Sequence, residues 1–361
     1  MHFQIRKSVL LSAINTVERA TSPNNPKKVL AGIQLKADRK DLTLTANNLE
    51  IAIQTKIPCT AMKTGEAIVD GRLFSSLIRR LPDDNVIFEL KDAQLLISAG
   101  NMEFTLYTIV DDLPEFPACE EQILALTDYE LQRLINNSVF AVSTEEHQPI
   151  FSGVLLETTE EKLSFVATDS NRLSYVKAQT GEVLVSDLRL VVPSSSLNEL
   201  VRCLPLAETL VEVFYGENQL VFQFEDTLFA TRLIDGTFPN YEPVIFVDQE
   251  TTLVLKRRQF LEALERASLF IRSENTPVII QVKEGVLKIA VSTQLGKSSE
   301  QFNVEQKGKD EQAAYSPKFL LDMLTTTHAE LVEFRFEGPR QALLKSVENE
   351  DHLYVLMPVR I

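Results

Sequence analysis

The sequence has few of the residues that mark redox, zinc, nucleotide or membrane proteins. Its three cysteines, Cys59, Cys119 and Cys203, are far apart and form no CxxC pair, which argues against a disulfide framework or a zinc site. Only 12 glycines occur, and neither a GxxxxGK[ST] nor a GxGxxG run supports nucleotide binding. No stretch approaches the roughly 18 apolar residues of a membrane span, and the charged start of the chain is unlike a signal peptide. We therefore expect a cytoplasmic globular protein with no cofactor and no metal.

Catalytic patterns are equally scarce. The four histidines are scattered and form no HExxH motif, so each is expected to be structural or on the surface. The adjacent pairs Asp111-Asp112 and Glu145-Glu146 suggest metal-dependent hydrolysis only if carboxylates from such pairs converge in one cleft, whereas acidic neighbours in loops are usually solvated. We expect no catalytic residue and no enzyme activity.

Basic side chains are in the minority, because 36 Lys and Arg face 51 Asp and Glu for a formal net charge of −15. Phosphate binding is driven by basic surface, so this total argues against a nucleic-acid partner unless the charge is unevenly distributed.

One pattern of helices and strands occurs three times along the chain. Amphipathic helices are expected from Lys7, Asp128 and Arg257, with apolar residues at helical spacing. The corresponding apolar positions are Leu10, Ala13 and Ile14 in the first copy, Leu131, Leu134 and Ile135 in the second, and Leu261 and Leu264 in the third. Second helices are expected from Leu73, Ser195 and Pro317, and strands of alternating polarity follow every helix.

Helix starts are marked by capping residues. Thr127 with Glu130 and Ser196 with Glu199 have the spacing of capping boxes, and Ser316-Pro317 reads as an N-cap followed by proline at the first helical position. The pattern predicts an α+β protein of three similar domains, 1–121, 122–245 and 246–361, each with two units of helix plus antiparallel sheet.

Positive charge is concentrated in three of the six expected helices. The segments 6–20, 71–83 and 256–267 carry a surplus of Lys and Arg, and Lys27-Lys28 follow the first of them. A solvated helix face is the usual fate of such charges. If these helices instead face a common channel, they would hold DNA by its phosphates without reading bases.

Three runs resemble a known family: LSFVATDSNRLSYV from Leu163, LIDGTFPNYEPVI from Leu233 and LYVLMPVRI from Leu353. They are similar to the beta subunit of bacterial DNA polymerase III, the sliding clamp, and the resemblance extends over the whole chain. It implies a non-catalytic, head-to-tail homodimer that closes into a ring around duplex DNA and tethers polymerases. Heterologous interfaces close into rings when the rotation per subunit permits.

The resemblance also implies the residues of three surfaces. The seam between the two subunits would contain Phe104 and Leu106 on an edge strand and Leu269 and Phe270 after a helix, four residues that could equally be ordinary core. DNA would be contacted by Lys27, Lys28, Arg72, Arg79 and Arg80, with Gln148 as a weaker polar contact. A groove for short apolar peptides of the polymerase, the clamp loader and repair proteins would be lined by Phe151, Thr168, Arg172, Leu173, Pro239, Val244, Val355, Leu356, Met357, Pro358, Val359 and Arg360.

The groove chemistry suits this role, because aliphatic walls and a flexible methionine accept several related peptides and arginines at the rim can orient them. The sequence departs from the family pattern at Ser170, Asn171 and Pro243 in the groove, and at Ser194-Ser195, where a basic residue is common. A clamp-like scaffold that binds partners without encircling DNA is therefore the alternative, and it could be monomeric.

Overall fold

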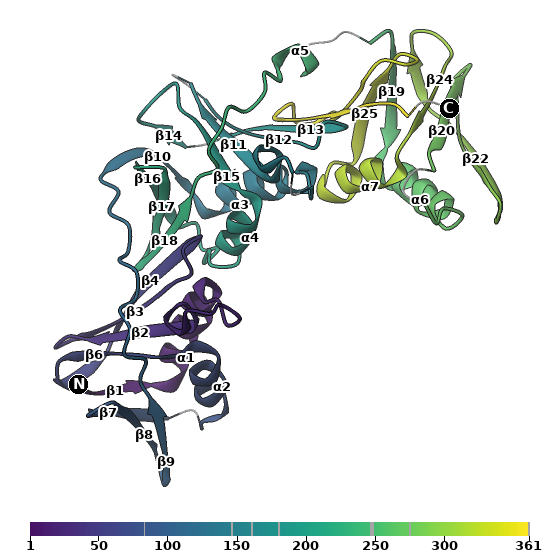
Figure 1. The fold of residues 1–361 in the computed structure, drawn as a ribbon. Coiled ribbons are helices and arrows are strands. Elements are labelled where there is room, and N and C mark those ends of the chain that lie inside the picture. Colours follow the sequence, from purple (N-terminus) through teal and green to yellow (C-terminus); the bar gives the residue numbers. More distant parts are fainter. Residues whose placement is uncertain are drawn as a thin grey trace. The chain divides into compact units, whose positions relative to one another are not determined.

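The computed structural model describes residues 1–82, 84–145, 147–159, 162–179, 181–245, 249–273 and 276–359. The chain folds into two compact units (Figure 1). Unit 1 comprises Met1–Tyr129 and Ser195–Leu233, and unit 2 comprises Glu130–Ser194 and Ile234–Ile361. No helix of the described ranges is long and apolar enough to cross a membrane.

Unit 1 is built on two antiparallel sheets. The smaller sheet has the order β5-β1-β7-β8-β9 and consists of Thr60–Lys63, His2–Arg6, Asn85–Lys91, Gln94–Ala99 and Met102–Tyr107. The larger runs β10-β16-β17-β18-β4-β3-β2-β6 and consists of Glu121–Thr127, Leu210–Gly216, Gln219–Phe224, Thr227–Arg232, Ile51–Pro58, Asp41–Asn47, Gly32–Ala37 and Gly65–Asp70. Strands β4 and β18 join its two halves, with Thr55 opposite Thr227.

Helices α1 (Lys7–Val17) and α2 (Gly71–Arg80) lie side by side against the sheets of unit 1 (Figure 1), and 3-10 turns η1 (Glu18–Ala20) and η2 (Lys28–Ala31) follow α1. Helix α2 starts two residues earlier than the apolar pattern predicts. The carboxylate of Asp70 accepts a hydrogen bond of 2.7 Å from the amide of Leu73 and caps the helix.

Unit 2 also contains two antiparallel sheets. One has the order β15-β11-β12-β13-β27-β26-β25-β19-β23 and consists of Arg189–Pro193, Gly153–Thr158, Leu163–Thr168, Arg172–Lys177, His352–Leu356, Ala342–Ser346, Leu331–Phe336, Thr251–Lys256 and Glu305–Lys307. The other has the order β22-β21-β20-β24 and consists of Gly296–Asn303, Val286–Thr293, Val278–Lys283 and Glu311–Tyr315.

The remaining elements of the described ranges are helices, two 3-10 turns and one short strand. Helices α6 and α7 lie side by side within unit 2 (Figure 1), and α3 and α4 start at the boundaries between the segments of the two units. Their bounds are Asp128–Asn136 for α3, Ser194–Val201 for α4, Glu242–Ile245 for α5, Arg257–Ser268 for α6 and Pro317–Thr326 for α7; the 3-10 turns η3 and η4 are Val139–Ala141 and Pro149–Ser152, and the short strand β14 is Glu182–Val183.

The α+β class is confirmed, and the helices recur where the repeat predicts them. The first helix of each copy starts at Lys7, Asp128 and Arg257. In the third copy, however, the buried face contains Phe260, Ala263 and Leu264, so the assignment of Leu261 to it was wrong. Leu261 lies one position out of phase, because the first turn of α6 begins with three polar residues whose spacing does not fix the phase of the apolar stripe.

The three expected helix starts have different outcomes. Ser316 is the N-cap of α7 with Pro317 at the first helical position, as predicted, although its side chain makes no capping hydrogen bond. Helix α3 begins at Asp128, directly after Thr127. The capping box at Ser196 was wrong, because α4 already begins at Ser194 and Ser196 is a buried residue inside the helix.

Candidate functional site

The structure brings most of the residues expected to line the groove together around a hollow of about 320 Å³ in unit 2. Its walls come from the end of β12, the start of β13, the end of β27 and the segment that leads into α5. The lining residues are Phe151, Thr168, Ser170, Arg172, Leu173, Pro239, Asn240, Tyr241, Val244, Val355 and Met357.

Strand pairing brings these distant segments together. Leu173 on β13 lies opposite Val355 on β27, and the amide of Met357 donates a 2.8 Å hydrogen bond to the carbonyl of Asn171. Both Leu173 and Val355 are buried, whereas Met357 is 43% exposed at the mouth. The strand near the C-terminus is therefore docked between β13 and β26, as its apolar density predicts.

Tyr241 holds one wall of the groove in place. Its hydroxyl donates a hydrogen bond to the carboxylate of Glu157, and its ring packs against that of Tyr175 at 5.7 Å between centroids. Burial, followed by the bond to Glu157, raises the pKa of Tyr241 well above its ordinary value. The hydroxyl is therefore protonated at neutral pH and remains a donor to Glu157.

Arg172 does not stand at the rim as expected, because its side chain is only 6% exposed. The guanidinium donates to the carboxylates of Asp169, at 2.9 Å, and Asp322, and to the carbonyl of Phe140 at 2.5 Å. It also stacks over the ring of Phe319 at 4.4 Å. A buried arginine needs such partners for its charge, so here Arg172 builds the wall rather than offering donors to a ligand.

A second, more polar hollow of about 540 Å³ shares Arg172 with the groove. Val359 lines it, and the amide of Val359 donates a 2.8 Å hydrogen bond to the carbonyl of Ala314. Asn171 and Lys318 also line this hollow. Unit 2 therefore has one mostly apolar and one more polar hollow, and the two share Arg172.

Eight of the twelve groove candidates line the main hollow: Phe151, Thr168, Arg172, Leu173, Pro239, Val244, Val355 and Met357. Leu356 is buried and Pro358 half-buried, and neither lines it. Alternate residues of a strand face opposite sides, which turns Leu356 away from Val355. Arg360 lies outside the described residues.

Sequence reasoning missed Asn240 and Tyr241 as lining residues and left Ser170 open. Both missed residues stand in the quoted run LIDGTFPNYEPVI, so their proximity to Pro239 was the available signal. Ser170 has a positive φ of 74°, which fits the glycine that the family pattern favours there. Pro243 is exposed on α5 and does not line the hollow.

The DNA-contact candidates are exposed. Arg72, Arg79 and Arg80 lie on α2, and Arg79 donates to the side chain of Asn15 at 3.0 Å. Lys27 directly precedes η2, and Gln148 directly precedes η4, so these two hold the same place in successive copies of the repeat. Lys28 opens η2.

Other basic helix residues are partly neutralised within the chain. Arg19 pairs with Glu199 at 2.9 Å, and Arg266 with Glu300 at 2.7 Å. Lys7 donates to the carbonyl of Leu81 at 2.6 Å, which satisfies the end of the neighbouring helix. The positive surplus in these segments is therefore smaller at the surface than in the sequence, although no ion pair of the described residues involves Arg72, Lys27 or Lys28.

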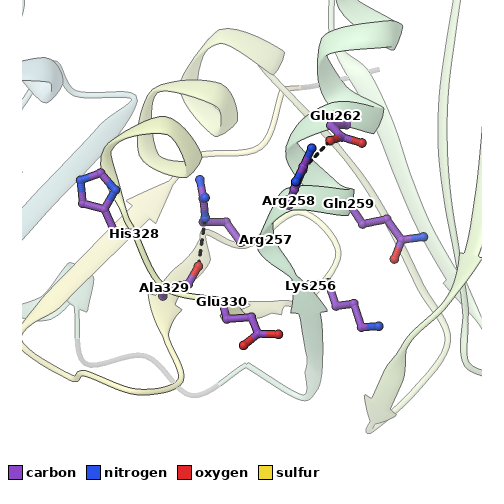
Figure 2. Close-up of a pocket in the computed structure, with 8 residues that line it drawn as sticks. All are labelled: Lys256, Arg257, Arg258, Gln259, Glu262, His328, Ala329 and Glu330. Atoms are coloured by element: carbon purple, nitrogen blue, oxygen red, sulfur yellow. Dashed lines mark hydrogen bonds and ion pairs between the residues drawn. The ribbon is translucent and has the colours of Figure 1, made fainter.

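A further hollow, of about 590 Å³, lies at the start of α6 (Figure 2). Arg257 lines it and also caps α7, donating to the carbonyls of Ala329 at 2.9 Å and Leu324 at 2.8 Å. Arg258 folds back onto Glu262 at 2.8 Å, as the dashed line in Figure 2 marks. The hollow has charges of both signs, because Lys256, Arg257 and Arg258 line it together with Glu262 and Glu330.

The seam candidates lie beside two edge strands. Phe104 and Leu106 point inward on β9, the edge of its sheet, and Leu106 is buried. Leu269 is 79% exposed at the end of α6, and Phe270 follows it beside Gly296, the first residue of edge strand β22.

The acidic and histidine residues considered as catalytic candidates are scattered over the described ranges. No group of three or more His, Cys, Asp or Glu side chains there is positioned to hold a metal ion. Glu145 pairs with His147 at 3.1 Å at the surface, and Glu146 lies outside the described residues. His352 is a structural histidine, since its Nε2 lies 2.8 Å from the hydroxyl of Ser174 in the buried sheet.

Comparison with known proteins accounts for the whole chain. Family models of the DNA polymerase III beta subunit match as its N-terminal domain at residues 1–119, its central domain at 125–240 and its C-terminal domain at 243–360. The beta sliding clamp of Bacillus subtilis (strain 168) is 30% identical over 377 residues, with 100% of both chains covered. The chain belongs to the DNA polymerase III beta subunit family.

Solved structures agree with this membership. The sliding clamp of Bacillus subtilis has a TM-score of 0.95 and 29% identity, covering 100% of this chain and 99% of that one. The beta subunit of Streptococcus pyogenes has a TM-score of 0.95 and 27% identity, with 100% of both chains covered. The three-domain clamp fold is thereby established, and the function is that of a DNA sliding clamp for polymerase processivity.

Proposed function

We propose that two copies of the chain associate head to tail into a ring that encircles duplex DNA and tethers the replicative polymerase. The observation that carries this proposal is a pair of uncovered edge strands, β9 in unit 1 and β22 in unit 2. Exposed edges invite pairing with another chain, and proteins usually shield them. Pairing β9 of one copy with β22 of another is heterologous, so two such seams close a dimer.

Apolar packing would seal this seam. Leu269 is exposed beside β22, where a side chain of that size is costly to leave in water, and Phe104 stands half-buried on β9. With Leu106 and Phe270 beside them, strand pairing and apolar contact act together.

DNA would be held loosely by its phosphates. Arg72, Arg79, Arg80, Lys27 and Lys28 are exposed cations on the helical elements of unit 1. Contacts of this kind carry no sequence information, and weak ones allow the ring to slide. Gln148, at the place of Lys27 in the next copy of the repeat, would add a neutral contact.

The groove of unit 2 would bind short apolar peptides of the polymerase catalytic subunit, the clamp loader and repair proteins. Its aliphatic walls and exposed Met357 support this assignment, because a flexible thioether adapts to related ligands. Pro358, Val359 and Arg360 would extend the site along the same C-terminal segment, and Leu356 would support it from the opposite face of β27.

We also propose domain boundaries at 121/122 and 245/246. The first is supported by the gap between the family models that end at 119 and begin at 125, whereas the C-terminal model already begins at 243. The chain would be a non-catalytic subunit of the cytoplasm, where the chromosome is replicated. The relatives are sliding clamps, and none of the comparisons favours a scaffold that does not encircle DNA.

The test is retention on DNA. The chain is loaded on nicked circular plasmid with the cognate loader and ATP, and complexes are separated by gel filtration in high salt. Topological linkage predicts retention on circles and rapid loss after the plasmid is cut once. Salt-sensitive binding to both forms would contradict encirclement, and absence from both would favour the scaffold.

A variant sharpens this test. Leu269→Asp should abolish retention on circles by opening the seam, whereas Leu184→Asp, a substitution of another exposed leucine of unit 2, should leave it unchanged. Equal retention of both variants would show that a closed seam is not required.

A further inference from the structure

Unit 1 contains a hollow whose walls repeat those of the groove in unit 2. It measures about 270 Å³ and is bounded by the end of β3, the start of β4, the end of β18 and the connecting segment 114–118. The groove is bounded in the same way by β12, β13, β27 and the segment 239–244. The two hollows therefore occupy the same place in two copies of the repeat.

Backbone hydrogen bonds support this equivalence. The amide of Arg232 donates to the carbonyl of Glu50 at 3.0 Å, just as the amide of Met357 donates to Asn171 at 2.8 Å. Both bonds tie the end of a strand, at its last residue Arg232 or at Met357 just after it, to the turn before the neighbouring strand. Glu50 and Arg232 thus hold, in unit 1, the places of Asn171 and Met357.

The turns at the two mouths are also built alike. The amide of Ile51 donates to the side chain of Asn48 at 2.9 Å, and that of Arg172 donates to Asp169 at 3.0 Å. On the strand that follows, Ala52 lies opposite Ala230, as Leu173 lies opposite Val355. The floor of the unit 1 hollow is consequently apolar.

Leu49 distinguishes the unit 1 hollow. It has a positive φ of 77° at the place where unit 2 has Ser170, and its side chain is 40% exposed at the mouth. A leucine in the left-handed region is strained, because its Cβ approaches the neighbouring carbonyl oxygen, and such strain concentrates at binding sites. Since Ser170 forms the same turn, the turn itself does not require a leucine.

Charge is the second difference. Glu50 and Glu115 are exposed on the walls of the unit 1 hollow, with Arg232 on the opposite strand. Half-buried Phe116 packs onto the apolar floor beside them. The hollow therefore combines an apolar base and an exposed leucine with a surplus of carboxylate at the rim.

We infer that this hollow is a second docking site, for a partner segment that places an apolar side chain next to lysine or arginine. The inference rests on the proposed function, because the groove of unit 2 is its template. The apolar side chain would lie against Leu49 and Phe116, and the cation against Glu50 and Glu115. One ring could then hold a neutral apolar peptide in unit 2 and a basic one in unit 1.

Photo-crosslinking of the full-length protein tests this. Two acetylated, amidated pentapeptides, KLKLF and SLSLF, carry p-benzoylphenylalanine in place of their phenylalanine. After irradiation, the labelled segments are identified by mass spectrometry. We expect SLSLF to label residues 239–244 or 355–357 of unit 2. KLKLF should label these segments and, in addition, residues 49–52 or 114–118 of unit 1.

Charge reversal gives the matched variants. Glu50→Lys with Glu115→Lys should weaken KLKLF labelling in unit 1 by about tenfold, since each reversal replaces an attraction by a repulsion. Glu66→Lys with Glu225→Lys makes the same change of net charge at exposed sites of unit 1, with Glu225 in the β17–β18 turn at the opposite end of β18 from the hollow, and should leave labelling unchanged. SLSLF labelling of unit 2 should not respond to either variant.

Labelling by KLKLF in unit 2 alone, or nowhere, would overturn the inference, as would unit 1 labelling that survives Glu50→Lys with Glu115→Lys. The proposed groove fails separately, if neither peptide labels unit 2. Unit 1 labelling by KLKLF in that case would uphold the second site without the first.

Discussion

The guanidinium of Arg172, at the start of β13, is bound to the carboxylate of Asp322 on α7, 150 residues further along the chain. The same guanidinium is held by Asp169 and stacks over Phe319. One side chain thus ties a groove wall to a helix within unit 2.

Removing the charge of Arg172 should destabilise unit 2. Arg172→Gln leaves Asp169 and Asp322 without their cation, and loss of one partner from a buried pair costs about 3–5 kcal/mol. We expect a lower midpoint of urea unfolding, followed by circular dichroism. Arg340→Gln, which removes an exposed pair with Glu337, should cost less than about 1 kcal/mol; equal losses would mean that burial does not set the cost.

Acid should weaken unit 2 through His352. Burial lowers the pKa of His352 from its ordinary value of 6.5 to about 4, with the charge of Arg133 as a smaller cause. Between pH 4 and 6.5, His352 is therefore protonated in the unfolded chain but neutral in the folded one. The contribution of neutral His352 to the free energy of unfolding is fully present above pH 6.5. It is lost as the pH falls towards 4, by roughly 3 kcal/mol at most.

The matched variant is His352→Leu, which removes the titrating group while Ser174 keeps its hydrogen bond to the carbonyl of Asn137 at 2.5 Å. The melting temperature, measured from pH 7.5 to 4.5, should fall less steeply for this variant than for the parent. Parallel profiles would show that other groups cause the acid loss.

Truncating the groove methionine should weaken peptide binding without unfolding the protein. Met357→Ala removes apolar contact area at the mouth, and losing a few methylene-sized groups costs about 1–2 kcal/mol, or roughly tenfold in Kd. Fluorescence anisotropy with labelled SLSLF measures this. Met62→Ala, at a methionine that is 59% exposed on β5 of unit 1, should leave the Kd unchanged.

The seam prediction concerns association. Leu269→Asp places a charge where the proposed interface is apolar, so sedimentation should show monomers at concentrations at which the parent is dimeric. Because Leu269 is largely solvent-exposed within one chain, the melting temperature of the monomer should be little affected. A dimeric Leu269→Asp variant would place the seam elsewhere.

DNA contact should appear in the salt dependence. If Arg72 neutralises one phosphate, Arg72→Ser reduces the slope of log K against log salt by about 0.9. Binding of the dimer to a short duplex, measured between low and moderate salt, gives this slope. Lys40→Ser, in the exposed β2–β3 turn, is the control. An equal change of slope in both variants would mean that Arg72 on α2 contacts DNA no more than any exposed cation.

Local patterns predicted the helices, and the family resemblance supplied the groove residues that line the hollow. Both failed where long-range packing decides. The repeat located α1, α3 and α6, yet the polar first turn of α6 left its phase ambiguous by one residue, which misplaced Leu261. Arg172 was expected at the rim because the family resemblance implied it as one of the groove arginines that orient a peptide. Only the distant Asp322 and Phe319, which no local pattern links to it, turn it into a buried wall residue.

The second hollow was missed for the same reason. Its walls depend on the pairing of Ala52 with Ala230, and the alternation within each strand says which face is buried but not which strand is the neighbour. Once that pairing is known, Leu49 with its positive φ and the exposed Glu50 can be placed at the mouth of the unit 1 hollow.

The pairing of β4 with β18 also has a consequence for synthesis. Thr55 and Thr227 share a 2.9 Å hydrogen bond across 172 residues, and the chain builds part of unit 2 between them. During translation β4 is therefore made long before the strand that covers it and waits as an open edge. Pairings this distant fold slowly and expose nascent chains to aggregation, so the ribosome-bound first segment of unit 1 should be a substrate for chaperones.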